Sequence, residues 1–230
     1  PSAGLEDQHW QTGETQVYAC DLTLDLNTVN RFLSLSEENR KVTCRREEQP
    51  YPDHPERFEG WPQVLCREGL TGRCYWEVEW SGIGVGIGVT YKEISRRGGG
   101  DDSLIGSNDK SWILFCYDNS YTAWHNNNAT TIDVPSSSSN IVGVYLDWPA
   151  GSLSFYSVSS DTLTRLYTFY TTFTEPLYPG FNVWYDSSVV SSDMLTHLHT
   201  FTSTFTEPLY PGFMVWDDDS SVSLCQVVPV

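Results

Sequence analysis

Alternation of side-chain types is strongest in residues 69–91 of this 230-residue chain. Trp76, Val78 and Trp80 are apolar at every second position, a period of two that is typical of a strand buried on one face. The chain continues with glycine at each even position from 82 to 88 and with isoleucine or valine at each odd position from 83 to 89. These runs predict two adjacent strands, the second with a bare face that another backbone or a large ring can approach closely.

A phosphate-binding glycine loop is the alternative interpretation of residues 82–88. Such a loop needs a helix directly after it. Thr90 and Tyr91 instead continue the strand pattern, and residues 96–100 then read as a loop. The pattern therefore favours a strand.

Short apolar runs separated by turn residues occur along most of the chain. They predict further strands at residues 20–25, 41–44, 61–66, 110–117, 121–125, 141–147, 152–156 and 221–226, and a turn or single helical turn at 27–36. No long stretch sustains a helical period, and no apolar run is long enough to span a membrane. Nine Trp and thirteen Tyr supply rings to fill the space between two sheets. We therefore expect an all-β fold, an antiparallel β-sandwich.

The formal net charge of −17 is unevenly distributed, because residues 101–230 contain only two basic residues, Lys110 and Arg165. Such a surface repels phosphate backbones, so we expect no nucleic-acid partner. A basic protein surface would be attracted to it. The same charge is equally consistent with a role in solubility alone.

The six cysteines show no metal-binding spacing. Cys74 and Cys116 lie within apolar strand patterns, where a reduced cysteine acts as a small buried hydrophobe. We therefore expect a reducing, cytoplasmic environment, although the even count leaves disulfides open. Asn128 begins a glycosylation sequon that matters only if the chain is secreted.

Residues 159–190 and 191–222 are near copies of each other. The sequence Phe-Thr-Glu-Pro-Leu-Tyr-Pro-Gly-Phe at 173–181 recurs at 205–213. Two copies are too few for a solenoid, and a closed sandwich has one place for this segment, so we interpret the repeat as an internal duplication. We expect the closing strand to follow the second copy, with part of the first copy displaced.

No catalytic or cofactor motif is evident. None of the serines lies in a nucleophile elbow, and we expect no metal site or cofactor. His197 and His199 could share one face of a strand, but the first copy has Arg165 and Tyr167 at these positions. Glu77 and Glu79, two apart on the polar face of one strand, are expected to face solvent rather than to form a glycosidase pair.

Many separate segments together resemble a PRY-SPRY (B30.2) domain. They are Leu24-Asp25, Asn27-Thr28, Leu33 to Ser36, Arg57-Phe58, Val64 to Cys66, Gly72, Tyr75 to Val78, Gly88-Val89, Ser111-Trp112, Val142 to Asp147, Leu153 to Tyr156, and Pro176 to Pro179 with its repeat. The resemblance divides the chain into an N-terminal arm (1–17), a PRY part (18–70) and a SPRY part (71–230). Leu26, where the family usually has proline, and the duplicated tail depart from the pattern.

The resemblance implies a bent, concanavalin-like sandwich without a catalytic centre, which recognises a protein ligand through loops and one concave face. Phe115 and Tyr117 fall on ligand-contact positions of the family, although Phe115 could equally belong to the core. The phenylalanine after Pro-Gly in the last hairpin, Phe181 or Phe213, is another such position. Gly86 replaces an acidic contact of an antibody-binding member, which argues against that ligand.

The proline-rich segment 45–62 resembles the first variable loop of the family. Three prolines in six residues exclude a central strand and favour a surface loop. Arg46, Tyr51 and His54 are its candidates for setting specificity, although a solvated loop would have the same composition.

Three functional hypotheses follow. The first is a non-enzymatic protein-recognition module, the ligand-sensing end of an innate-immune protein such as a tripartite-motif ubiquitin ligase or a NOD-like receptor. The second is the C-terminal module of a secreted fish pore-forming toxin, which secretion and use of Asn128 would favour. The third is a sandwich-fold hydrolase or lectin, which the absence of a triad and of metal-ligand spacing disfavours.

Overall fold

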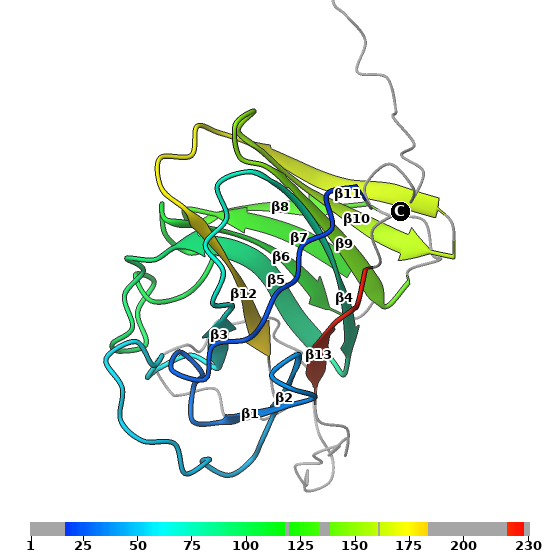
Figure 1. Ribbon diagram of the computed structural model, residues 1–230. Helices are drawn as coiled ribbons and strands as arrows, with labels where there is room; N and C mark the ends of the chain where they lie inside the picture. The colour runs from blue at the N-terminus through cyan, green and yellow to red at the C-terminus, as the bar shows by residue number, and fades with distance from the viewer. Residues whose placement is uncertain (1–16, 118–119, 134–138, 161, 184–219, 228–230) are drawn as a thin grey trace, which may run out of the picture.

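The computed structural model describes residues 17–117, 120–133, 139–160, 162–183 and 220–227. Over these residues the chain forms two antiparallel β-sheets that pack face to face, with no helix (Figure 1). The strands are β1 (Leu33–Ser36), β2 (Lys41–Cys44), β3 (Gln63–Leu65), β4 (Arg73–Ser81), β5 (Gly84–Tyr91), β6 (Ser111–Tyr117), β7 (Ser120–His125), β8 (Asn128–Ile132), β9 (Ile141–Asp147), β10 (Ser152–Ser159), β11 (Thr162–Tyr170), β12 (Leu177–Val183) and β13 (Ser221–Leu224). The predicted antiparallel β-sandwich is confirmed.

In both sheets, strands that lie side by side often come from distant parts of the sequence. The seven-stranded sheet has the order β1-β2-β13-β4-β9-β10-β11, and the six-stranded sheet has the order β3-β12-β5-β6-β7-β8. Both sheets therefore combine strands from the PRY and SPRY parts of the chain. The two parts share one core and form a single folding unit.

The main core lies between the sheets, where β4 and β5 contribute alternate residues. Those that point inward are all buried: Cys74, Trp76, Val78, Val85, Ile87 and Val89. Burying one such aliphatic side chain stabilises a fold by roughly 1.5–3 kcal/mol. The alternation seen in the sequence thus corresponds to the inward face of each strand.

The glycine positions of β5 lie on its other face, as predicted. A Cβ atom at Gly88 would meet the carbonyl oxygen of Trp112 and would lie 2.8 Å from the Cα of Ile113. Only a residue without a side chain allows the backbone of β6 to approach this closely. The strand interpretation is therefore confirmed from Gly84 onward, and the phosphate-loop alternative is excluded. Gly82, with a φ of 92°, and Ile83 lie in the turn between β4 and β5.

Both ends of the described chain meet at β4. The backbone N–H of Cys20 donates to Tyr75 O (3.0 Å), and the N–H of Cys225 donates to Glu77 O (3.0 Å). Tyr18 and Val227 pack against Tyr75, which is fully buried although it alternates with the inward residues of β4. The outer face of β4 is therefore covered at this end.

The two copies of the repeat contribute different strands. The first copy supplies β12, which pairs with β3 and β5. The end of the second copy and the residues after it supply β13, which pairs with β2 and β4. The closing strand therefore follows the second copy, as expected. The remainder of the second copy, including Phe213, lies outside the described residues.

The structure also differs from the pattern-based expectations. Residues 33–36 form strand β1, paired with β2, where a turn or single helical turn was expected. The run at 20–25 forms only isolated bridges, Ala19 with Tyr75 and Leu24 with Cys66. Strands β8 and β11 were not predicted. Strand β8 is a polar edge strand, and in β11 a register shift at Leu166 interrupts the alternation, so that its buried residues Leu163 and Leu166 are three apart.

Candidate ligand-recognition surface

Strand β6 becomes more exposed towards its C-terminal end. Trp112, Leu114 and Cys116 point into the main core. The opposite face carries Ile113, which is fully buried, then Phe115, which is half-buried, and then Tyr117, which is 59% exposed. Tyr117 is therefore a large aromatic side chain presented to solvent by a strand whose other residues are mostly covered.

Neighbouring strands hold Phe115 and Tyr117 in place on the outer face of the six-stranded sheet. Phe115 packs edge-on against Trp124 of β7, with ring centroids 5.7 Å apart. On the other side Phe115 is paired with Gly86 and Tyr117 with Gly84, so both rings adjoin bare glycine backbone. We call Tyr117, Phe115 and Trp124 the aromatic patch.

Asn182 of β12 adjoins this patch and was not considered from the sequence. It is 1% exposed, and neither Oδ1 nor Nδ2 of its side chain has a hydrogen-bond partner. Its backbone pairs with Gly86, the residue that also pairs with Phe115. A buried amide without partners costs a fold roughly 1–3 kcal/mol and calls for an explanation.

The phenylalanine positions of the last hairpin differ from the aromatic patch. Phe181 is fully buried in the main core between the sheets, so its side chain does not reach the surface. We therefore omit Phe181 from the proposed contact surface. Phe213, its equivalent in the second copy, is among the residues that the structure does not describe.

The loop at 45–62 carries the other candidates in different environments. Arg46 is exposed. Tyr51 is half-buried and its hydroxyl donates to Leu33 O (3.0 Å), while burial raises the pKa of this hydroxyl. His54 Nδ1 accepts a hydrogen bond from the N–H of Glu56 (3.2 Å), so the neutral ring carries its proton on Nε2. Tyr51 is thus a structural residue of the loop, His54 is half-buried, and Arg46 is exposed.

An open cavity of about 550 Å³ lies beside this loop. Its lining residues are Arg31, Asp53, His54, Pro55, Arg57, Phe58, Glu59 and Arg97. Two ion pairs cross its edge, Arg31 to Asp53 at 2.5 Å and Arg97 to Glu59 at 2.8 Å. The described surface thus offers two candidate contact sites. The cavity is lined by charged side chains, and the aromatic patch presents the exposed ring of Tyr117.

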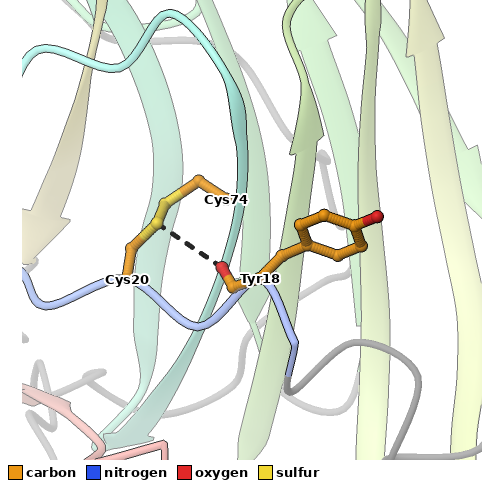
Figure 2. The surroundings of a disulfide bond; sticks show 3 residues. All are labelled: Tyr18, Cys20 and Cys74. Atoms are coloured by element: carbon orange, nitrogen blue, oxygen red, sulfur yellow. Dashed lines mark hydrogen bonds between the residues drawn. A yellow bond between two sulfur atoms is a disulfide. The ribbon is translucent and has the colours of Figure 1, made fainter. Parts of the chain in front are cut away.

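A disulfide joins Cys20, in the segment that enters the domain, to Cys74 of β4, with Cα atoms 5.6 Å apart (Figure 2). The interpretation of Cys74 as a reduced thiol is therefore wrong. The two cysteines are 54 residues apart in sequence, so no local spacing marked them as a pair. Figure 2 also shows Cys20 Sγ facing the carbonyl oxygen of Tyr18, at 3.5 Å.

The other four cysteines form no disulfide: Cys44, Cys66, Cys116 and Cys225. Burial raises the pKa of the Cys66 and Cys116 thiols well above the ordinary range, and it raises the pKa of Cys225 to about 11. The thiols of Cys66, Cys116 and Cys225 are therefore protonated and unreactive at neutral pH. Within the described part of the chain, no three His, Cys, Asp or Glu side chains cluster as metal ligands would.

The described residues thus form an antiparallel β-sandwich with an accessible aromatic strand end and a charged cavity beside one loop. The chain matches the model of PRY, the SPRY-associated domain, over residues 22–70, and the model of the SPRY domain over residues 73–194. It therefore belongs to the PRY-SPRY family, as the sequence motifs indicated.

Similar proteins come from two groups. Stonustoxin subunit beta of Synanceia horrida is 47% identical over 169 residues, which cover 73% of this chain and 24% of the toxin subunit. Tripartite motif-containing protein 16 of Mus musculus is 43% identical over 166 residues, covering 71% of this chain and 30% of that protein. The chain thus spans about a quarter of the length of the toxin subunits that it matches.

Solved structures show the same two groups. The stonustoxin structure superposes with a TM-score of 0.74 at 38% identity, covering 97% of this chain and 30% of that one. The PSpry domain of TRIM65 superposes with a TM-score of 0.71 at 29% identity, covering 93% of both chains. None of the described residues forms a helix that could cross a membrane.

Proposed function

We propose that this chain is a non-enzymatic protein-recognition module whose ligand contacts the aromatic patch. The observation that carries the proposal is the exposure of Tyr117, at 59%, beside the half-buried ring of Phe115. Aromatic side chains of this kind are enriched among residues that dominate binding energy at protein interfaces. Within the patch, the ring of Phe115 packs edge-on against the ring of Trp124.

The main chain fixes the orientation of both histidines that the structure describes. His125 Nδ1 lies 2.8 Å from Ser111 O, and the ring stacks on Trp112 at 4.6 Å. His54 Nδ1 accepts from the backbone N–H of Glu56. The stacking on the buried ring of Trp112 gives His125 a structural role.

The charge of the chain suggests the kind of protein ligand. At a formal net charge of −17, electrostatic attraction favours a partner with a basic surface and disfavours nucleic acid. Asp53, whose side chain is 99% exposed, is one acidic group that such a partner can contact.

The first candidate for the parent protein is a cytoplasmic innate-immune protein, a tripartite-motif ubiquitin ligase or a NOD-like receptor, with this chain as its ligand-sensing end. The similarity to tripartite motif-containing protein 16, and to the TRIM65 domain over 93% of both chains, supports it. Ubiquitin-ligase activity would then belong to other parts of the parent.

The second candidate is a secreted toxin of the stonustoxin type. The disulfide between Cys20 and Cys74 favours it, because disulfides persist in oxidising compartments. Asn128 of the glycosylation sequon is exposed at the start of the edge strand β8. Mass spectrometry of the native protein separates the candidates, since a glycan on Asn128 would exclude the cytoplasmic parent.

The recognition proposal is tested by affinity capture with the wild-type chain and two variants. Tyr117→Ala should retain its circular dichroism spectrum and lose the captured protein. Tyr170→Ala is the matched control, because Tyr170 is 72% exposed on β11 of the other sheet. Capture that survives Tyr117→Ala, or that both variants lose equally, would refute the aromatic patch as the contact surface.

A further inference from the structure

The cavity beside the loop at 45–62 concentrates positive charge in a strongly acidic chain. Three arginines line it, Arg31, Arg57 and Arg97, in a protein whose formal net charge is −17. Its two carboxylates belong to Asp53 and Glu59. The arginines come from distant parts of the sequence, so the fold rather than a local charge run brings them together.

Arg57 forms the buried floor of the cavity. It is 6% exposed, and its guanidinium donates to the carbonyl oxygens of Pro52 (2.9 and 3.2 Å), Leu26 (3.0 Å) and Val29 (2.6 Å). Its hydrogen bonds go to neutral carbonyl groups, so its charge is not cancelled by a direct carboxylate partner. Burial, and next the positive charge of Arg31, lower the pKa of Arg57. The floor is therefore a site of unneutralised positive charge.

Arg31 provides a second positive charge, and it has more N–H groups than its two contacts use. Two of its five N–H groups are used, one by Tyr51 O (2.6 Å) and one by Asp53 Oδ1 (2.5 Å). The Asp53 side chain is 99% exposed, so water competes for this ion pair. Exposed ion pairs contribute at most about 1 kcal/mol. A ligand carboxylate can therefore replace Asp53 at little cost, and Arg guanidinium groups bind carboxylates with paired hydrogen bonds.

The solvent side of the cavity carries both signs of charge. The Asp53 side chain is 99% exposed, and Glu59 (50%) is paired with the more exposed Arg97 (78%). Arg57 is buried behind these exposed carboxylates, an arrangement that is complementary to an acidic side chain flanked by basic ones. This pattern agrees with a partner whose surface is basic overall, since only one acidic group needs to enter.

We propose that this cavity binds the carboxylate of an acidic side chain on the protein ligand, with basic neighbours of that side chain placed at Asp53 and Glu59. The proposal rests on the proposed function, because it assigns a second contact of the same protein ligand. Arg31 receives the carboxylate with the N–H groups that Tyr51 and Asp53 do not use, the positive charge of Arg57 lies on the same lining, and His54 Nε2–H is a further donor there. The cavity is thus specific for one acidic residue of the protein ligand.

The test is a ¹H–¹⁵N NMR titration of the chain with the peptide acetyl-Lys-Glu-Lys-amide. We expect shifts confined to residues 52–59 and to Arg31 and Arg97. The peptide acetyl-Lys-Gln-Lys-amide should bind about tenfold more weakly, because it lacks the charge that the arginines receive. Equal shifts with the two peptides, or none with either, would overturn the assignment. This comparison uses the unaltered chain and does not depend on the folding of a variant.

A pair of variants tests whether Arg31 is responsible for binding of the glutamate peptide. Arg31→Gln should weaken binding of the glutamate peptide about tenfold. Arg40→Gln is the matched control, because Arg40 and Arg31 make the same contact to an exposed aspartate at 2.5 Å, with side-chain exposures of 30% and 32%. Arg40 is remote from the cavity lining, so its variant should bind normally. Equal loss in both variants would show a general charge effect and contradict the proposal.

The same titration separates this inference from the proposed function. A Tyr117→Ala chain should bind the glutamate peptide as the wild type does, because Tyr117 is not part of the cavity. If the peptide fails to bind while capture of the protein ligand still depends on Tyr117, the cavity assignment is wrong and the recognition module stands. If the peptide binds and capture is independent of Tyr117, the aromatic patch is wrong instead.

Discussion

The ring of Phe115 lies over the backbone of Gly86, its cross-strand partner on the outer face of the six-stranded sheet. A methyl group on Gly86 would lie 3.1 Å from Phe115 Cε1 and 2.6 Å from Ile113 Cδ1. The absence of a side chain at residue 86 therefore allows Phe115 to sink to a half-buried position. Tyr117, two residues further along β6, then stands out beyond it.

Gly86→Ala should push Phe115 outward and destabilise the fold. Overpacking of this kind costs about 1–3 kcal/mol, measurable as a lower urea midpoint. Gly72→Ala is the matched control, because no atom lies within 4 Å of a Cβ at that position. Its effect should stay within about 0.5 kcal/mol. Equal stability of the two variants would contradict the packing of Phe115 on Gly86.

Asn182→Leu should stabilise the protein by about 1–2 kcal/mol, because it removes a buried amide that has no hydrogen-bond partner. Asn30→Leu provides the contrast. The Asn30 amide is also buried, but it donates to Phe58 O and Glu59 O and accepts from the N–H of Phe32. Its loss should destabilise by about 1–3 kcal/mol. Thermal unfolding distinguishes the two, and destabilisation by both would show that Asn182 is satisfied in solution.

If Asn182→Leu is stabilising and also weakens ligand capture, the amide is retained for binding. If ligand capture is unchanged, ligand binding does not explain why the destabilising Asn182 amide is retained. This outcome bears on the aromatic patch, because Asn182 and Phe115 share Gly86 as a cross-strand neighbour.

The strands that bury one face could be predicted from the sequence, since alternation in β4, β5 and β9 reports directly which residues meet the core. The edge strand β8 could not, because it is polar and has no apolar period. The edge strand β11 could not, because the register shift at Leu166 breaks the alternation of its apolar residues. Residues 33–36 were misassigned because a four-residue edge strand is too short to show a period of two.

The candidate site was predictable only in part. Resemblance to the family located Tyr117, which the structure exposes, but it also selected Phe181, which alternation along β12 directs into the core. Asn182 could not be found, because the absence of a hydrogen-bond partner is a property of the fold. The approach of Arg31 to Arg57 depends on the path of the proline-rich loop, for which spacing in the sequence gives no signal.

Removal of the disulfide should lower stability substantially. Cys20→Ala frees a loop closed over a sequence separation of 54 residues, for which chain entropy predicts a loss of about 4 kcal/mol. The measurement is urea unfolding with and without a thiol reductant. The reductant should destabilise the wild type and leave Cys20→Ala unchanged. A wild-type midpoint that does not respond to the reductant would show that the bond contributes nothing to folding.

Alkaline pH should destabilise the fold through its buried thiols. Burial raises the pKa of Cys66 and Cys116, and it raises that of Cys225 to about 11, above the ordinary thiol value of 9.0. Each raised pKa means that the folded state holds a proton that the unfolded state has already lost. Stability is therefore complete below about pH 9 and falls as pH rises, by at most about 1.4 kcal/mol per pH unit for each thiol.

Between pH 9 and 11 the variant Cys225→Ala isolates one of these thiols. It should show a shallower fall in stability than the wild type, because the proton linkage of residue 225 is gone. Cys44→Ala is the comparison, since it removes a buried thiol for which we make no such prediction. Urea midpoints measured across this range give the slopes. Identical slopes for wild type and Cys225→Ala would mean that the Cys225 thiol has the same pKa in the folded and unfolded chains.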